Sequence, residues 1–254
     1  MIKVQNLYKS FGNLDVLKGL NTSFEKGQTN LIIGQSGSGK TVFLKCMLGL
    51  FEPDKGNICY DTQNYEELSS TQRRELRKQI GMVFQGGALL DSMTVEQNVM
   101  FPLRMFSKRN KTEMKDRVNE VLKRVNLVNA NDKFPSEISG GMQKRVSIAR
   151  AVVNRPKFLF CDEPNSGLDP KTATVIDNLI QEITHEFDIT TVVNTHDMNS
   201  VFEIGEKIVF IQNGSIAWEG DKEQIHRTEN KAVTDFVYSS DLFRKVRVAQ
   251  RKGL

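Results

Sequence analysis

The sequence predicts an α/β protein with a mostly parallel central sheet. Short apolar segments of strand length alternate with longer segments in which apolar residues recur at helical spacing. Parallel strands need helical connections of this kind, and the helices cover both faces of the sheet. A glycine-rich segment, residues 34–41, lies between the apolar segment 29–33 and a helix that begins near Lys40, which is an order of elements typical of α/β folds.

The first 33 residues predict a β region with antiparallel strands. Apolar residues recur between Ile2 and Leu7 and again between Val16 and Phe24, before the turn signal Glu25-Lys26-Gly27.

Residues 88–154 predict a helical sub-domain. We expect helices at 95–106, bent or ended by Pro102, at 112–125, and from Ser139 to Asn154. The helix at 112–125 is amphipathic. Its apolar face carries Met114, Val118, Val121, Leu122 and Val125, and its polar face offers the i,i+4 pairs Glu113–Arg117 and Glu120–Arg124.

Strands and helices alternate in the rest of the chain. We expect strands at 57–60, 80–84, 157–161 and 189–195, helices at 71–79 and 170–187, and a hairpin of 208–211 and 215–218 that turns at Asn213-Gly214. Residues 1–240 would form one domain, followed by a basic C-terminal extension at 241–254.

Composition and charge exclude several classes of function. The net charge of +4 in 254 residues is too small and too spread to indicate a nucleic-acid partner. No segment approaches the length of apolar sequence that crosses a membrane, and the N-terminus lacks the apolar core of a signal peptide. Cys46, Cys59 and Cys161 form no zinc or redox pattern. We therefore expect a cytosolic protein with reduced thiols.

The segment Gly34-Gln35-Ser36-Gly37-Ser38-Gly39-Lys40-Thr41 matches the phosphate-binding pattern G-x-x-x-x-G-K-[ST] at every fixed position. Its glycines let the backbone turn where a Cβ would clash, so amide hydrogens can point at phosphate oxygens. Lys40 supplies a positive charge for the β- and γ-phosphates, and Thr41 supplies a hydroxyl for Mg²⁺. The helix that follows adds the positive end of its dipole.

Four polar groups follow apolar strands, at the sheet edge where α/β proteins bind ligands. They are Thr41 with its loop, Gln85, Asp162-Glu163 and His196. Asp162 can hold Mg²⁺, since a hard cation prefers carboxylate oxygen, and Glu163 can polarise an attacking water. Gln85 can bind Mg²⁺ or that water, and His196 can contact the γ-phosphate region. Phosphoryl transfer depends mainly on positioning and charge stabilisation of this kind.

Three further features each allow a structural interpretation. Ser139-Gly140-Gly141 opens a helix, either as a second anion site or as an ordinary serine cap. Ser166-Gly167-Leu168-Asp169-Pro170 taken alone is only a helix start. Phe11, in a loop between strands, could stack on a flat base or belong to the core.

In combination these motifs resemble the ABC ATPases, the nucleotide-binding subunits of ABC transporters. The phosphate loop, Gln85, 138–143, 160–164, 166–169 and His196 appear in that family's order and near its spacing, and the resemblance covers residues 2–225. It implies a head-to-tail homodimer that binds two ATP molecules. Each ATP would lie between one phosphate loop and Ser139-Gly140-Gly141 of the other subunit. The resemblance also implies that Phe11 stacks on adenine beside Val16, and that Asp169 joins the nucleotide site.

One departure narrows the resemblance. This chain has Met142 where the family's signature most often has Gln. Met142, together with segments 84–91 and 94–99, makes the sequence similar to the ATPases of Mla-type phospholipid transport. Those ATPases work with an integral membrane permease and an MCE-type lipid-binding protein. We therefore expect a peripheral protein on the cytoplasmic side of the inner membrane, with residues 88–106 docking the permease.

The basic tail carries apolar residues between its cations, which predicts docking rather than a solvated end. Two surfaces could receive the tail, the anionic inner leaflet of the membrane or the other ATPase subunit. The resemblance to the Mla-type ATPases favours the second, so we predict that Phe243 and Val246 pack on the partner subunit. Other functions compatible with the sequence are an ABC ATPase for another substrate, or a signalling or divisome ATPase that grips a membrane protein. ATPases that act on ribosomes or DNA usually need a second cassette or a long coiled coil, for which 254 residues leave no room.

Overall fold

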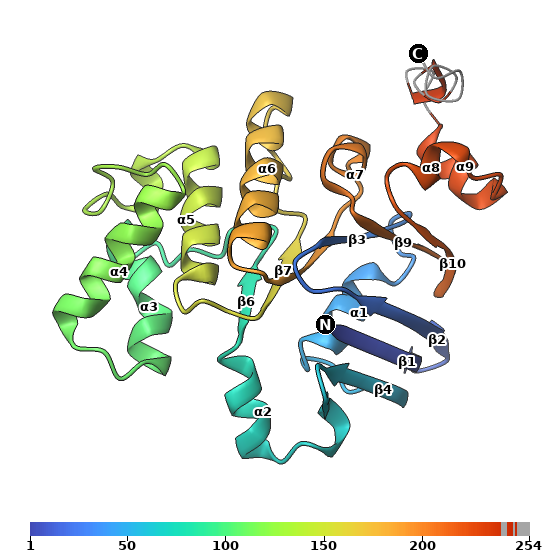
Figure 1. Ribbon diagram of the computed structural model, residues 1–254, viewed down its shortest axis with the longest axis horizontal. Coiled ribbons are helices and arrows are strands. Elements are labelled where there is room, and N and C mark those ends of the chain that lie inside the picture. Colours follow the sequence, from blue (N-terminus) through green and yellow to red (C-terminus); the bar gives the residue numbers. More distant parts are fainter. Residues whose placement is uncertain (240–242, 246, 248–254) are drawn as a thin grey trace.

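The computed structural model describes residues 1–239, 243–245 and 247. Two sheets form its centre (Figure 1): a four-stranded antiparallel sheet of order β2-β1-β4-β5 and a six-stranded sheet of order β10-β9-β3-β8-β7-β6. The α/β class with its N-terminal antiparallel region and mostly parallel core sheet is therefore confirmed.

The strands are short and the helices connect them in the predicted alternation. The strands are β1 (Ile2–Phe11), β2 (Leu14–Phe24), β3 (Thr29–Ile33), β4 (Lys55–Tyr60), β5 (Gln63–Asn64), β6 (Ile80–Val83), β7 (Phe158–Asp162), β8 (Thr190–Asn194), β9 (Lys207–Gln212) and β10 (Ser215–Gly220). The helices are α1 (Lys40–Met47), α2 (Ser70–Arg77), α3 (Val95–Phe106), α4 (Lys111–Arg124), α5 (Gly140–Val152), α6 (Pro170–Glu186), α7 (Met198–Ile204), α8 (Gln224–Arg227) and α9 (Lys231–Val237), with single 3₁₀ turns at Tyr65–Glu67 and Pro135–Glu137.

The register of the core sheet brings the site-bearing strand ends together. β3 pairs in parallel with β8 on one side and β9 on the other, β8 pairs with β7, and β7 with β6. The hairpin strand β10 is antiparallel to β9. Consequently β3, β6, β7 and β8 all end at the same edge of the sheet, followed respectively by residues 34–41, Gln85, Glu163 and His196.

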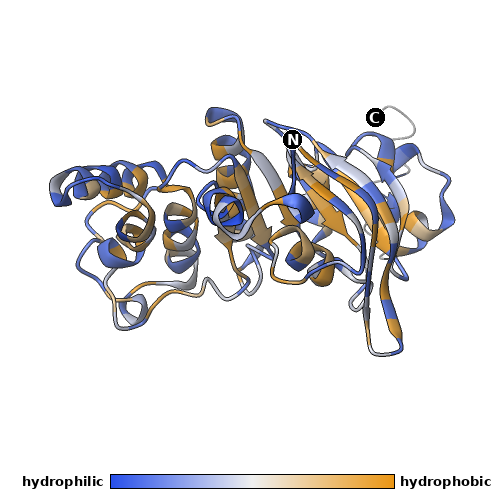
Figure 2. Cartoon of the chain, turned by 90° about the horizontal axis from the view of Figure 1, so that it is seen from below, coloured by the Kyte–Doolittle hydropathy of each residue, from blue (hydrophilic) through white to orange (hydrophobic). Residues whose placement is uncertain are grey.

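Side chains alternate between two hydrophobic cores, one on each face of the core sheet. On β9, Ile208 and Phe210 face the core that includes α3 to α6, while Val209 and Ile211 face the core that includes α1 and the antiparallel sheet. The hydropathy colouring in Figure 2 shows the apolar residues concentrated on the strands and the inward helix faces. Two-sided burial explains why these strands are continuously apolar in the sequence.

Helix α3 continues through Pro102 to Phe106, so this proline does not end it. Thr94 starts the helix with a capping box in which its hydroxyl accepts from the Gln97 amide. The Ser107 amide donates to the Leu103 carbonyl at the other end. The helix therefore presents Phe101, Met105 and Phe106 on one exposed side.

The ion pairs expected along α4 are wrong in detail, although the apolar face of that helix is confirmed. Arg117 is buried, donates to the Val152 and Val153 carbonyls, and pairs with Glu120 rather than with Glu113. Arg124 pairs with Glu182 and Glu186 of α6. Neighbouring helices offer these cations better-placed acceptors than a solvated i,i+4 carboxylate does, and helical spacing cannot reveal such partners.

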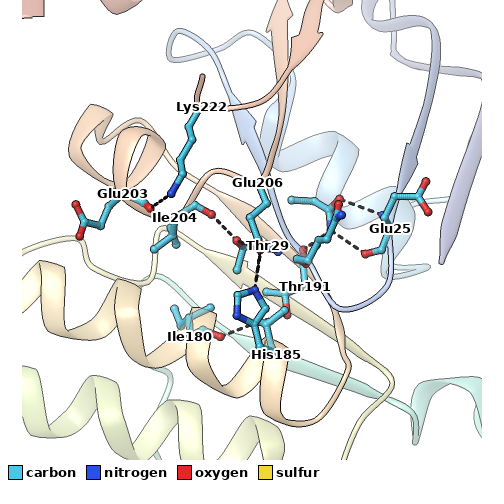
Figure 3. A network of polar contacts seen from close by, with 12 residues as sticks. Glu25, Thr29, Ile180, His185, Thr191, Glu203, Ile204, Glu206 and Lys222 are labelled. Carbon is cyan, nitrogen blue, oxygen red and sulfur yellow. Dashed lines mark hydrogen bonds and ion pairs between the residues drawn. The ribbon is translucent and has the colours of Figure 1, made fainter. Parts of the chain in front are cut away.

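A polar network fixes the edge of the sheet opposite the site (Figure 3). Glu206 accepts from the amide of Thr29 at 2.7 Å and from its hydroxyl at 2.8 Å, and His185 of α6 lies 3.0 Å from the same carboxylate. Nearby, the hydroxyls of Thr184 and Thr191 are 2.6 Å apart. These contacts join the starts of β3, β8 and β9 to α6.

The part of the chain after β10 returns toward the core sheet. Phe236 of α9 lies 5.3 Å from Phe210 between ring centroids, and Phe243 lies 5.3 Å from Phe202 of α7. Phe243 thus packs at least partly on its own chain, its contact with a partner stays a prediction, and Val246 lies outside the described residues. Among the described residues, no helix combines the length and hydrophobicity needed to cross a membrane.

Candidate nucleotide-binding and catalytic site

A cavity of about 840 Å³ opens at the carboxyl edge of the core sheet. The phosphate loop forms one wall, and the ends of β6, β7 and β8 contribute another. Its lining includes Val16, Gly34, Gln35, Ser36, Gly37, Gly39, Lys40, Thr41, Gln85, Glu163 and His196, together with Asp235, Phe236 and Ser239.

The backbone of the phosphate loop requires its glycines. Gly34, Gly37 and Gly39 have φ angles of 151°, 77° and 107°. A Cβ on Gly34 would lie 2.2 Å from the Ile211 carbonyl oxygen, so only glycine fits there. The loop leads directly into α1, whose first amides have no carbonyl partner within the helix. The buried hydroxyl of Ser38 has no hydrogen-bond partner among the described residues. The loop and the start of α1 therefore form a site for an anion whose oxygens can accept hydrogen bonds from these groups.

Lys40 lies inside this anion site and is almost fully buried. Its Nζ donates to the carbonyls of Gly34 at 2.9 Å and Gln35 at 3.0 Å. Burial lowers the pKa of Lys40, and the charges of Glu163 and Asp162 partly oppose that shift. A phosphate beside the ammonium group would favour the charged form of Lys40, which burial disfavours.

Glu163 connects two of the other strand ends. Its carboxylate accepts from Gln85 Nε2 at 2.8 Å and lies 2.8 Å from His196 Nδ1. The residue has a φ of 46°, in the left-handed region, and its amide donates to the Asn194 carbonyl at 2.8 Å. Holding a glutamate in this conformation costs free energy and orients its side chain into the cavity rather than along β7.

Asp162, the last residue of β7, is half-buried and accepts from Asn194 Nδ2 at 2.5 Å. Burial raises the pKa of Asp162, the hydrogen bond from Asn194 opposes this, and the charge of Glu163 raises it further. Among the described residues, no group of three or more His, Cys, Asp or Glu is placed to hold a metal. A cation here would therefore also need hydroxyl, amide or phosphate oxygens.

Several predicted nucleotide-site residues lie away from this cavity within the single chain. Ser139 caps α5, where its hydroxyl accepts from the Met142 amide, and Gly140 and Gly141 form the first turn, in which Ser139 and Gly140 are exposed. Asp169 caps α6 through Thr172. Both match the structural interpretation of their motifs. Phe11 ends β1, is 44% exposed and packs edge-on against Phe51 at 5.3 Å.

Helix α5 also holds the loop after Gln85, a feature that the sequence did not indicate. Lys144 donates to the Gln85 carbonyl, Ser147 to that of Gly87 at 3.1 Å, and Arg150 to those of Gly87 and Ala88, each at 2.6 Å. The three donors recur every third residue, which places them on one helix face. Such spacing also describes an ordinary solvated face, so the sequence could not distinguish the two.

The geometry agrees with the known proteins to which the chain is similar. Residues 17–166 match the family model described as ABC transporter. The chain is 36% identical to the probable ribonucleotide transport ATP-binding protein mkl of Mycobacterium leprae over 236 residues, covering 93% of this chain and 68% of that protein. It is 37% identical to the methionine import ATP-binding protein MetN of Clostridioides difficile over 237 residues, covering 93% of this chain and 74% of the relative.

Two solved structures of ATP-binding cassette proteins have a similar fold. The post-hydrolysis dimer of the ATP-binding cassette MJ0796 bound to ADP and Pi superposes with a TM-score of 0.79 at 32% identity, covering 87% of this chain and 99% of that one. CbiO1 from Clostridium perfringens, part of the cbiONQ transporter complex, gives a TM-score of 0.84 at 29% identity, covering 97% of this chain and 94% of that one.

Proposed function

This chain belongs to the ABC transporter family as an ATP-hydrolysing subunit, and we propose that it powers a membrane permease that imports a small solute. The observation that carries the proposed chemistry is the contact of Glu163 with both Gln85 and His196 beside the phosphate loop. ATP would place its phosphates in the loop 34–41 and its γ-phosphate toward this group. Glu163 would then accept a proton from the attacking water, and His196 would hold Glu163 and the γ-phosphate in position.

Mg²⁺ fits the donors at this edge. Thr41 supplies a hydroxyl oxygen, Gln85 an amide oxygen and Asp162 a carboxylate whose burial disfavours an uncompensated charge. When bound, the ion would neutralise the phosphates. Asp162 would be ionised opposite the cation, and Asn194 would keep its carboxylate oriented.

We propose that two subunits assemble head to tail around two ATP molecules. The turn at Ser139-Gly140-Gly141 and the helix start at Asp169 lie outside the cavity of their own chain. They would complete the site of the partner, with the α5 amides facing its γ-phosphate. The dimeric assembly of the MJ0796 cassette supports this arrangement. Adenine would lie against Val16, with Phe11 at the edge of the site.

The permease would dock in a second cavity, of about 350 Å³, between α3 and β6. Phe84, Leu90, Phe101, Met105 and Phe106 line it and are exposed or partly so. A cluster of this kind marks an interaction surface. Its position next to Gln85 would let the permease sense the nucleotide site, and it would place the protein at the cytoplasmic face of the membrane.

The names of the relatives favour import of a solute such as methionine or a ribonucleotide. A phospholipid is the second candidate, because Met142 and the segments 84–91 and 94–99 are similar to the Mla-type ATPases. An MCE-type partner would follow only from that second candidate. Mass spectrometry of small molecules and lipids that co-purify with the native complex decides between them.

Replacing the proposed base tests the chemistry. Glu163→Gln should retain ATP binding but lower turnover by about a hundredfold or more, since it cannot accept the proton. Steady-state phosphate release and equilibrium binding of a fluorescent ATP analogue measure the two effects. Lys40→Ala is the matched contrast and should weaken binding itself. Near-normal turnover in Glu163→Gln would refute the assignment.

A further inference from the structure

A buried carboxylate behind the catalytic edge has no role in the chemistry proposed above. Asp177 lies on α6, is 3% exposed, and belongs to a network of side chains near the site. Ser200 Oγ donates to Asp177 Oδ2 at 2.7 Å, and Asn165 Nδ2 lies 3.2 and 3.4 Å from the two carboxylate oxygens. Asn165 also donates to Ser200 Oγ at 2.9 Å.

The members of this network come from the segments that carry the proposed catalytic residues. Asn165 is two residues after Glu163, and Ser200 lies on α7, four residues after His196. Asn165 Nδ2 is also 3.4 Å from Asp197, which caps α7 directly after His196. Asp177 is thus the point on a long, rigid helix to which both segments are attached.

The network has few alternatives to Asp177. Asn165 and Ser200 are nearly fully buried, so water cannot readily replace a lost acceptor. Without the Asp177 carboxylate, the Asn165 amide would be left to Ser200 and to the longer contact with Asp197. The loop that follows Glu163 could then shift relative to the segment that follows His196.

We propose that Asp177 is a positioning residue for ATP hydrolysis: it anchors the loop after Glu163 to the segment after His196 and so preserves their 2.8 Å contact. This inference rests on the roles proposed above for Glu163 and His196. It does not involve the phosphate loop, which is attached to β3 and α1. Loss of the anchor should therefore change turnover and leave ATP binding intact.

The test compares variants of the full chain by their kcat and KM for ATP, with thermal unfolding measured in parallel. Asp177→Leu removes the acceptor while keeping a side chain of similar length, and should lower kcat about tenfold or more with little change in KM, because small displacements of catalytic groups are costly. Asp177→Asn retains an acceptor oxygen and should restore most of kcat. Ser200→Ala removes the hydrogen bond to Asp177 and the one from Asn165, but it leaves the Asn165 amide beside the Asp177 carboxylate, so it should show a smaller loss.

Thr184→Val is the matched control. Thr184 is also a buried polar residue of α6, but its hydroxyl contacts Thr191 and the Ile180 carbonyl at the far end of the helix. It should lower stability and leave kcat unchanged.

Wild-type kcat in a folded Asp177→Leu protein, or wild-type kcat in Ser200→Ala if Asp177→Leu does not fold, would overturn the proposal. So would losses of kcat that follow thermal stability across all variants, Thr184→Val included. Normal turnover in Glu163→Gln would instead contradict the catalytic roles on which the inference rests.

Discussion

Asp177 also illustrates how burial and hydrogen bonding compete at a single residue. Burial raises its pKa to about 6, the hydrogen bonds from Ser200 and Asn165 oppose the shift, and the charges of Asp197 and Glu203 on the α7 side reinforce it. In the unfolded chain this carboxyl has its ordinary pKa near 3.8. Between these two values the folded protein binds the extra proton, so ionisation of Asp177 lowers stability as the pH rises through this window.

We therefore expect Asp177→Asn to gain stability relative to the wild type as the pH rises from 4 to 7. The penalty removed is at most about 3 kcal/mol, the equivalent of a shift of roughly two units. Urea unfolding at a series of pH values measures the difference in stability between Asp177→Asn and the wild type. Glu206→Gln is a useful comparison, because hydrogen bonds from Thr29 and His185 hold the pKa of Glu206 below its ordinary value despite its burial. Glu206 stabilises the fold above its unfolded pKa, and that contribution is lost as the pH falls through its folded pKa. A difference between Asp177→Asn and wild type that stays constant with pH would contradict the expectation.

The residues at the strand ends could be predicted because each follows a continuous apolar segment. Gln85, Glu163 and His196 are polar where the sheet ends, and the structure brings all three together beside the phosphate loop. Asp177 could not be assigned in this way. Its helical spacing with Ile176 and Ile180 places it on the buried face of α6, but the partners that make its burial tolerable come from residues 165 and 200.

At the scale of elements, the long periodic helices and the strands of the core sheet were predicted to within about two residues. Strand β1 is longer than its apolar pattern indicates and includes Phe11, which the sequence placed in a loop. The short helices α7, α8 and α9 were not predicted, since none of them exceeds seven residues and none presents a full amphipathic repeat. The hydrogen bonds from α5 to the loop at 85–88 could not be predicted from the sequence either. Their acceptors are backbone carbonyls, which every residue has, so the residue types do not show where these bonds form.

That attachment predicts a stability cost for Arg150→Ala. The change removes the donors to the Gly87 and Ala88 carbonyls and should lower the free energy of unfolding by about 2 kcal/mol, as for hydrogen bonds from a charged donor. Chemical denaturation measures the loss. Arg145→Ala on the same helix is the control, since Arg145 makes no hydrogen bond or ion pair with the described residues, and its effect should be within about 0.5 kcal/mol. Equal effects of the two substitutions would exclude a specific role for the Arg150 contacts.

At the scale of the whole molecule, the proposed dimer makes each ATP site a product of two chains. Lys40→Ala and Ser139→Arg should each inactivate a homodimer, because both of its sites are damaged. Mixing the two variants should recover ATPase activity, since a mixed dimer has one site with an intact Lys40 and an intact Ser139. Activity is followed against the mixing ratio. Failure to recover activity, with mixed dimers demonstrated by differential tagging, would contradict a shared site.

The position of β3 in the core sheet has a consequence for biosynthesis. The strand that carries the phosphate loop is made early, at Thr29–Ile33, yet both of its neighbours, β8 and β9, are made more than 150 residues later. During translation both edges of β3 stay unpaired until β8 and β9 have been made. Strand pairings between segments so distant in sequence form slowly. We therefore expect a ribosome-bound chain to bind ATP only after residues up to Gln212 have emerged, so that nucleotide stabilises only the nearly finished polypeptide.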